Sequence, residues 1–162
     1  MNFLSIDPGK EVGIACWKNN KFAEVVKFSF NDSEFQSTNL VNLINLISSL
    51  ASKIQAEAII TERPARSLAI QFTLYSDLKL LSKKRKMSFV AYPPKKVKKI
   101  ASGNGNASKD DMSIALMIRK ICSNKKIESF DEHEVDSICV GICFLEDLVG
   151  GDKKKVKRRK GQ

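Results

Sequence analysis

The N-terminal part of the chain changes from a strand-like pattern to a helix-like pattern and back, and this order restricts the fold more than any other feature. Short β-type runs separated by turn residues predict an antiparallel meander, with strands at residues 2–7, 12–18 and 22–30. From about Gln36 to Ile54, apolar residues recur at the three-and-four spacing of an amphipathic helix. The segment EAIITERP, residues 57–64, then predicts a fourth strand, which its proline ends.

The rest of the chain alternates between helix and strand. In order, we expect a helix at 65–86, a strand at 88–93, a short basic helix begun by Pro93-Pro94, a helix from the N-cap Ser108 to about Cys122, and a helix at 132–149. This order predicts one α/β domain over residues 1–150, in which helices flank a mixed five-stranded sheet. Residues 151–162 are strongly basic, and we expect a disordered tail there.

The distribution of charge favours a polyanionic partner. The net charge is +10, and the segment DKKKVKRRK near the C-terminus carries seven of the 28 basic residues. A second basic cluster extends from Leu78 to Lys109, where ten basic residues occur without one acidic residue. An ordinary solvated surface would mix both signs of charge, so the second cluster predicts nucleic-acid binding. The tail fits either phosphate binding or a solubilising role.

Other features of the sequence bear on the cellular setting. No apolar run approaches the roughly 20 residues of a membrane-spanning helix, and the N-terminus lacks the pattern of a signal peptide. We therefore expect a cytoplasmic protein that works without a membrane. The four cysteines lie in apolar or helix-like stretches and form no C-x-x-C pair, which predicts reduced core residues at Cys16, Cys122, Cys139 and Cys143.

Two apolar strands each end in a carboxylate, which core packing does not require. Asp7 ends the first strand in FLSIDPG, and Glu62 ends the fourth in AIITERP. If these strands are neighbours, the two side chains emerge together at the edge of the sheet where α/β proteins commonly bind ligands. Two like charges buried side by side require a proton or a cation between them. Carboxylate oxygens select hard divalent ions, so this pair predicts a site for Mg²⁺ or Mn²⁺.

The last helix supplies two more candidate ligands in DEHEVDSICVG. His133 and Asp136 are three residues apart and therefore share a helical face, while Val135, Ile138 and Cys139 belong to the apolar face. His133 is the only histidine in the chain. By itself such a residue is more typical of a helix surface, but together with the strand-end carboxylates it is a candidate metal ligand.

Four motifs in this order resemble the RuvC-type Holliday junction resolvases of the ribonuclease H-like superfamily. They are IDPG at the end of the first strand, the glutamate after AIIT, the loop SGNGNASK, and H-x-x-D on the last helix. The resemblance covers roughly residues 1–148. It implies a ribonuclease H-like fold and a metal-binding catalytic tetrad of Asp7, Glu62, His133 and Asp136, with histidine where other members carry aspartate.

The resemblance also implies a mechanism and partners. Two Mg²⁺ or Mn²⁺ ions about 4 Å apart would act on the phosphate, with Asp7 bridging them and with Lys98 and Lys109 close to the cleaved bond; Lys109 would offset charge that builds on the phosphate. The expected activity is that of a crossover junction endodeoxyribonuclease, a homodimer that resolves four-way DNA by two symmetric nicks with 5′-phosphate and 3′-hydroxyl ends. The nitrogen ligand His133 predicts activity with Mn²⁺ equal to or above that with Mg²⁺.

Basic residues near these motifs are candidate DNA contacts. Relatives carry an aromatic residue shortly after the catalytic glutamate that is thought to wedge into the junction. Here the nearest aromatic residue is Phe72, which we predict to be core, so flaps and forks are further candidate substrates. The predicted DNA-binding residues are Arg63, Arg66, Lys83, Lys84, Arg85, Lys95, Lys96, Lys98, Lys99 and Lys109.

Three other functions fit parts of the sequence. A ribonuclease H-like nuclease could act on RNA–DNA hybrids or on RNA, and a basic nucleic-acid-binding module could keep the fold without catalysis. The turn in IDPGKEVG also resembles the phosphate loop of sugar kinase and actin-like ATPases, but those proteins need two such domains and 162 residues cannot supply them. Replacing Asp7 by Asn separates a nuclease, which loses cleavage, from a module that only binds.

Overall fold

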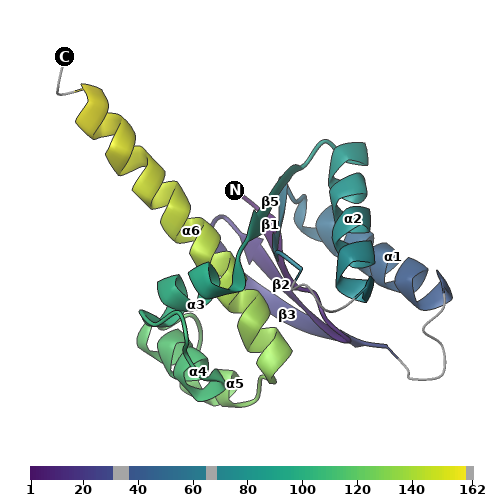
Figure 1. The fold of residues 1–162 in the computed structure, drawn as a ribbon, viewed down its shortest axis with the longest axis horizontal. Helices are drawn as coiled ribbons and strands as arrows, with labels where there is room; N and C mark the ends of the chain where they lie inside the picture. Colours follow the sequence, from purple (N-terminus) through teal and green to yellow (C-terminus); the bar gives the residue numbers. More distant parts are fainter. Residues whose placement is uncertain (31–36, 65–68, 160–162) are drawn as a thin grey trace.

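The computed structural model contains one five-stranded mixed sheet (Figure 1). It describes residues 1–30, 37–64 and 69–159. The first three strands pair antiparallel, while the fourth lies parallel to both the first and the fifth. This arrangement confirms the predicted meander and the mixed sheet. The strands are β1 (Phe3–Asp7), β2 (Glu11–Lys18), β3 (Lys21–Ser29), β4 (Ala58–Glu62) and β5 (Ser88–Tyr92), in the spatial order β3-β2-β1-β4-β5.

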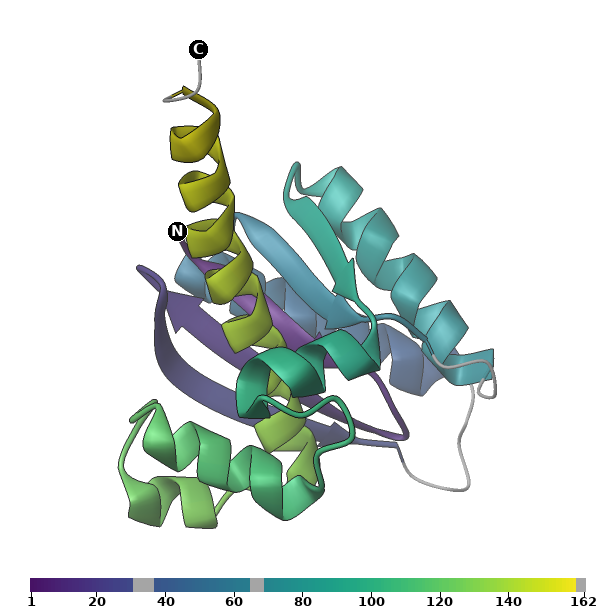
Figure 2. The ribbon, with the colours of Figure 1, turned by 60° about the vertical axis from the view of Figure 1, so that its left-hand side comes forward.

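Helices cover both faces of the sheet. The first two pack on one face, and the remaining helices lie on the other, where the last helix crosses the strands (Figures 1 and 2). The helices are α1 (Ser37–Ile54), α2 (Ala69–Lys84), α3 (Pro94–Ser102), α4 (Lys109–Ile118), α5 (Asn124–Glu128) and α6 (Glu132–Arg159).

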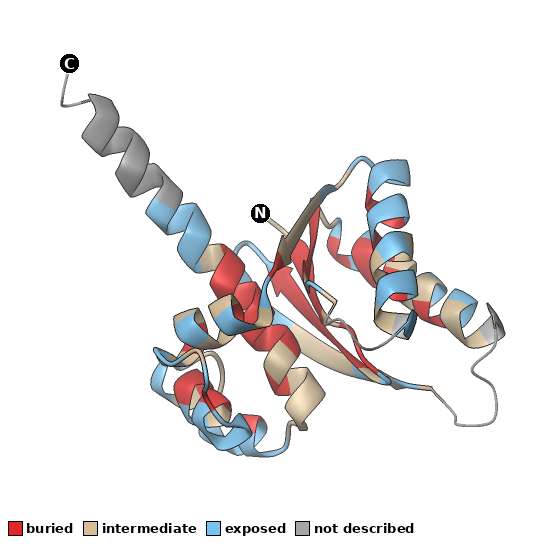
Figure 3. Ribbon diagram, in the orientation of Figure 1, coloured by how far each residue is buried: buried red, intermediate tan, exposed pale blue. Residues whose placement is uncertain are grey.

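Alternation along β1 produces a separate hydrophobic core on each face. Phe3 belongs to the cluster that includes Ile138 of α6, whereas Leu4 and Ile6 belong to the cluster that includes Leu43 of α1. Successive side chains of a strand point to opposite faces, so a strand covered on both sides is apolar along most of its length. Figure 3 shows the result, because the central strands are buried and are flanked by helices whose inner sides are buried.

A short chain of buried hydrogen bonds fixes α6 over β1 and β2. The indole N–H of Trp17 donates to Ser5 Oγ over 2.8 Å, and the Ser5 hydroxyl donates to the backbone carbonyl of Ser137 over 2.7 Å. Gly141 is required beside this chain, because a Cβ at that position would overlap the Trp17 indole. A buried polar group without a partner costs about 1–3 kcal/mol, so these hydrogen bonds favour this position of α6 over β1 and β2.

The region between α4 and α6 differs from the prediction. α4 ends at Ile118 rather than near Cys122, and Lys120 beyond it has a φ of 52°, in the left-handed region that commonly follows a helix end. The short helix α5, which follows Ser123, was not predicted. A helix of this length has too few residues to show a helical period, so the pattern in the sequence could not reveal it.

The last helix is longer than predicted. It continues to Arg159 rather than ending near Val149, so the backbone of residues 151–159 is helical where we expected a disordered tail. Lysine and arginine are good helix formers, and positive charge at the C-terminal end of a helix is favourable. Within the described residues, no helix has both the length and the apolar character that crossing a bilayer requires.

The cysteines are free thiols in the described part of the chain. Cys16, Cys139 and Cys143 are buried in the two cores, which confirms their predicted placement. Cys122 is half-buried at the edge of the core under α6.

Candidate active site

Asp7 and Glu62 lie side by side at the edge of the sheet, as predicted. β1 and β4 pair in parallel, with Ile6 opposite Thr61, so the next residue of each strand is the carboxylate. Asp7 has the same parity along β1 as Phe3, which packs under α6. Glu62 has the same relation to Ile60 on β4, and both carboxylates therefore face the α6 side of the sheet.

α6 brings His133 to these carboxylates. His133 Nδ1 lies 3.1 Å from Asp7 Oδ2, although 126 positions separate the two residues in sequence. Both side chains are largely buried, with exposed fractions of 25% for His133 and 14% for Asp7. The approach depends on Gly13, which pairs with Asp7 across β1 and β2, because a Cβ there would overlap the backbone carbonyl of His133.

The pKa shifts of the site carboxyls show that Asp136 lies close to Asp7 and Glu62. Burial is the main cause that raises the pKa of Glu62 to about 8, and the charges of Asp7 and Asp136 add to it. Burial and the charge of Asp7 raise the pKa of Asp136 to about 6. The hydrogen bond to Asp7 raises the pKa of His133 above its ordinary value. Three carboxyl groups thus repel one another in a poorly hydrated place, where the strand ends had predicted repulsion between Asp7 and Glu62.

The donors fit a divalent cation by their chemistry. Among the described residues, no three His, Cys, Asp or Glu side chains are already arranged as a metal cage. Carboxylate oxygens with one imidazole nitrogen nevertheless suit Mg²⁺ and still better Mn²⁺. A cation among Asp7, Glu62 and Asp136 would also remove the repulsion that raises the pKa of Glu62.

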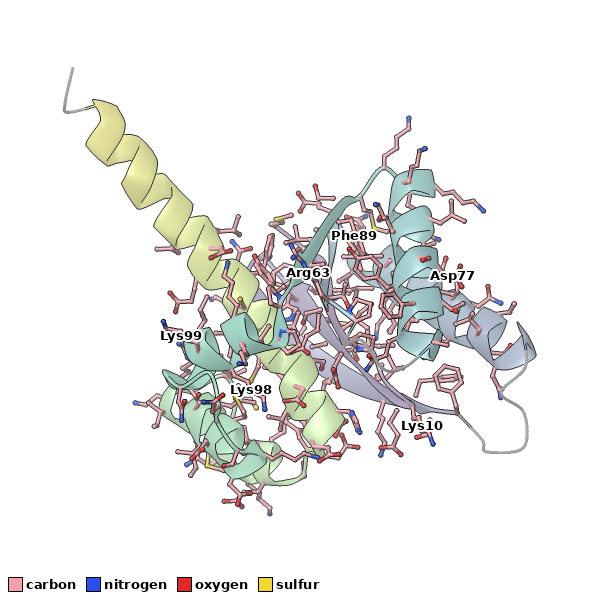
Figure 4. All side chains as sticks on the ribbon, viewed as in Figure 1. Lys10, Arg63, Asp77, Phe89, Lys98 and Lys99 are labelled. Atoms are coloured by element: carbon pink, nitrogen blue, oxygen red, sulfur yellow. The ribbon has the colours of Figure 1, made fainter. Side chains whose placement is uncertain are left out.

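Two of the predicted basic residues lie near the carboxylates. Lys98 lies on α3 (Figure 4). Its charge lowers the pKa of both Glu62 and Asp136, and its ammonium group donates to the carbonyl of Ala107 over 3.2 Å. Lys109, the first residue of α4, also acts on Asp136. The structure therefore brings both lysines to the site, where their charges oppose the repulsion among the acids.

Curated relatives identify the family. The chain is 30% identical to a protein named crossover junction endodeoxyribonuclease RuvC from Campylobacter concisus over 160 residues, which cover 91% of this chain and 98% of the relative. The chain belongs to the RuvC family. A RuvC protein of Sulfurovum is 31% identical over 159 residues, covering 90% of this chain and 96% of the relative. No protein-family model matches the sequence.

A solved RuvC structure has the same fold. The Thermus thermophilus RuvC in complex with a Holliday junction substrate superposes with a TM-score of 0.75 at 17% identity, covering 93% of this chain and 96% of that chain. This similarity confirms the ribonuclease H-like fold that the resemblance implied.

The other basic residues predicted for DNA binding are spread over several places. Arg63 is exposed directly after Glu62, and Arg66 lies outside the described residues. Lys95 and Lys99 are exposed on α3. Lys96 is engaged within the protein, because it forms an ion pair of 2.6 Å with Asp147 and lies over the Tyr92 ring.

The cluster at the end of α2 lies away from the site. Because α2 leads back from the end of β4 to the start of β5, its last residues lie at the opposite edge of the sheet from Asp7 (Figure 1). Lys83 and Lys84 are exposed there. The Arg85 guanidinium donates to the hydroxyls of Ser52 and Ser48 on α1, so this arginine joins α2 to α1.

The prediction for Phe72 was wrong. Its side chain is 49% exposed on α2, so it is not a core residue. The inner face of α2 is formed by Leu74 and Leu78, which are fully buried. Phe72 is offset from both of them around the helix, which leaves its ring toward solvent.

Four charged residues around His133 were missed by the sequence reasoning. Glu11 and Lys27 lie on β2 and β3, where their pattern is that of ordinary solvated strand residues. Asp131 gives a recognisable signal, since Asp131 and Glu134 have the spacing of a capping box at the start of α6. Glu132 lies beside this cap and forms an ion pair with Lys109.

Proposed function

We propose that this RuvC-family chain is a metal-dependent endonuclease that resolves Holliday junctions, and that residues 1–150 form its single nuclease domain. The observation that carries the proposal is the meeting of His133 on α6 with Asp7 at the end of β1, within 3.1 Å and beside two carboxyl groups of raised pKa. Curated relatives that cover almost the whole chain are named crossover junction endodeoxyribonucleases, which supports the same activity.

The metal ligands in this proposal are Asp7, Glu62, His133 and Asp136, and the cofactor is a pair of Mg²⁺ or Mn²⁺ ions. When bound, the ions supply the positive charge that in-line attack by water on phosphorus requires at the attacking and leaving oxygens. Asp7 would be central in holding the ions, because its charge acts on Glu62 and on Asp136 and its oxygen contacts His133.

The two lysines act on the substrate. Lys98 and Lys109 already influence the site carboxyls, so a scissile phosphate held against those carboxyls lies within reach of both ammonium groups. Their charge offsets the negative charge that grows on the phosphate during attack. Lys109 must leave its ion pair with Glu132 to do so, and its side chain is two-thirds exposed and free to turn.

The nitrogen ligand favours Mn²⁺ over Mg²⁺. Mg²⁺ prefers oxygen ligands, whereas Mn²⁺ accepts an imidazole readily. Cleavage with Mn²⁺ is therefore expected to equal or exceed cleavage with Mg²⁺ at the same concentration. The variant His133→Asp, with an oxygen ligand in its place, should reduce this preference for Mn²⁺.

DNA approaches over the α3 side of the sheet. Lys95 and Lys99 are exposed on α3 beside Lys98, and Arg63 is exposed next to Glu62, so these four residues provide backbone contacts around the site. Lys83 and Lys84 lie at the other edge of the sheet. They contribute only salt-dependent affinity, through DNA arms that extend to this edge. We expect the α3 lysines to change binding more than the α2 lysines.

The active form is a homodimer, and an apolar groove between α1 and α2 is the surface where the copies meet. Val41 and Leu80, which line it, are 55% and 50% exposed. Asp77 and Lys84 line the same groove two helical turns apart on α2, so two antiparallel copies of α2 would pair each Asp77 with Lys84 of the other copy. In sedimentation, Leu80→Glu should give a monomer.

A matched control tests whether the groove is specific. Ile118 on α4 is 75% exposed and lies outside the groove, so Ile118→Glu should remain dimeric. A dimer that survives Leu80→Glu, or that dissociates equally in both variants, excludes this surface.

The experiment that tests the function uses three substrates and both ions. A four-way junction labelled on each strand, a linear duplex and an RNA–DNA hybrid are incubated with Mg²⁺ or Mn²⁺. Paired nicks at symmetric positions in opposing strands of the junction, with ends that ligase can seal, are expected. Preferred cleavage of the hybrid would identify a ribonuclease instead, and an uncut junction with both ions would overturn the proposal. Flaps and forks in the same assay measure junction selectivity.

A further inference from the structure

Lys27 on β3 connects two acidic side chains at the edge of the site. Its ammonium nitrogen lies 2.5 Å from Asp131 Oδ2 and 3.6 Å from Glu11 Oε2. Asp131 belongs to the segment before α6, and Glu11 is the first residue of β2. One cation of the meander therefore holds groups from two elements that are far apart in sequence.

The first of these groups fixes the backbone at His133. Asp131 Oδ1 accepts hydrogen bonds from the backbone N–H groups of His133 and Glu134, each over 3.0 Å. Glu134 in turn accepts from the backbone N–H of Asp131 over 2.9 Å. This reciprocal cap sets where the first turn of α6 begins. Because Lys27 holds the capping carboxylate, it also fixes that turn relative to the sheet.

The second group faces the ring of His133. Glu11 Oε2 lies 3.5 Å from His133 Nε2, and Glu132 Oε1 lies 3.4 Å from the same nitrogen. The other ring nitrogen, Nδ1, points to Asp7. The carboxylates of Glu11 and Glu132 thus lie at Nε2, while Nδ1 faces the candidate metal site. In metal sites, carboxylates at the second ring nitrogen commonly orient a histidine ligand.

We infer that Lys27 and Glu11 are positioning residues, which hold the backbone and the ring of His133 so that Nδ1 faces the Asp7 site. The inference rests on the proposed role of His133 as a metal ligand. Lys27 acts through the Asp131 cap, and Glu11 acts on Nε2. Both residues act through Asp131 or His133, so they are positioning residues and not catalytic residues.

If the ion pair of Lys27 with Asp131 served only stability, its removal would leave His133 in place. Exposed pairs contribute about 0–1 kcal/mol to stability, and the loss of one should leave distant geometry unchanged. The chain offers a matched example in Lys53, which pairs with Glu24 of β3 over 2.6 Å away from the site. Lys27→Met and Lys53→Met therefore each remove an ion pair that includes one residue of β3, and only the first should affect His133.

Nuclear magnetic resonance of the metal-free protein gives a readout that does not depend on activity. His133 is the only histidine, so its ring protons form a single spin system. A Cβ built on Gly9 would lie 4.0 Å from His133 Cε1, which places the α-protons of Gly9 close enough for a nuclear Overhauser effect to the Hε1 proton. This signal reports the position of the ring directly.

The expected results separate positioning from stability. Lys27→Met and Glu11→Gln should each weaken the Gly9 signal and lower Mn²⁺ affinity in calorimetry roughly tenfold. Lys27→Arg should restore both, and Lys53→Met should change neither. If Lys27→Met retains the signal and the affinity, the inference is overturned, even where its melting temperature falls. Failure of the wild type to cleave junctions would reject the proposed function while leaving the ring position measurable.

Discussion

Replacing Glu62 by glutamine should stabilise the metal-free protein, which is unusual for a change in a candidate active site. Burial and the charges of Asp7 and Asp136 raise the pKa of Glu62 from 4.5 to about 8. The folded state therefore binds more protons than the unfolded state between these pH values, and stability falls as the pH rises through that window. Glutamine has a similar shape and carries no charge, so the variant avoids this loss.

The magnitude follows from the shift of the pKa. A carboxyl with a pKa of 4.5 when unfolded and about 8 when folded destabilises the folded state by about 3 kcal/mol at pH 7. Glu62→Gln should recover up to about this amount at pH 7 in the presence of a chelator. The gain should shrink toward zero near pH 4.5, where Glu62 is protonated in the folded state and half protonated in the unfolded state.

The assay uses Trp17, the only tryptophan, whose side chain is 1% exposed and reports unfolding by fluorescence. Urea denaturation of both proteins is measured from pH 4.5 to pH 8 with chelator and again with saturating Mn²⁺. Mn²⁺ should favour the wild type, because a bound ion stabilises only the folded state. Glu128→Gln, at an exposed position, is the matched control for the loss of one carboxylate. If Glu62→Gln is the less stable protein at pH 8 in chelator, the reasoning about repulsion is refuted.

Three further predictions concern the packing and charge around the site. Gly13→Ala should destabilise the protein by about 1–3 kcal/mol and impair junction cleavage, because the new methyl group displaces the His133 carbonyl; urea denaturation and a cleavage assay check this. Phe72→Ala should change stability by less than about 0.5 kcal/mol in the same denaturation assay, because the ring is half exposed. Lys98→Gln should raise the pKa of Glu62 further, because a nearby positive charge is lost, and should slow cleavage at saturating Mn²⁺, whereas the exposed Lys95→Gln should do neither.

The strand-end carboxylates show how far the sequence alone could predict the site. β1 and β4 are mostly apolar strands of five residues, and each ends in an acidic residue. Because strands of this kind are buried on both faces, they belong in the centre of a sheet, where they can be neighbours. The parallel pairing of β1 and β4 then puts Asp7 and Glu62 at one edge of the sheet. The helical period put His133 and Asp136 on one face of α6, although periodicity alone could not determine which strand that face would meet.

The contacts that the sequence did not reveal depend on how elements distant in the chain pack against one another. Lys27 reaches Asp131 only because β3 and the start of α6 pass close together, and nothing local to either residue indicates this contact. For a similar reason, the sequence did not show that Arg85 and Lys96, which are adjacent to lysines in sequence, bind groups within the protein. Phe72 was misplaced because an aromatic residue in a helical segment was assumed to face the core.

The central claim is that a divalent cation binds where Asp7 meets His133, and Mn²⁺ can test it directly. Mn²⁺ is paramagnetic and broadens the resonances of nuclei close to it. Added to the DNA-free protein well below one equivalent, it should erase the ring signals of His133 before those of surface residues, and Asp7→Asn should largely abolish this effect. His133 signals that persist while resonances elsewhere disappear would contradict the account.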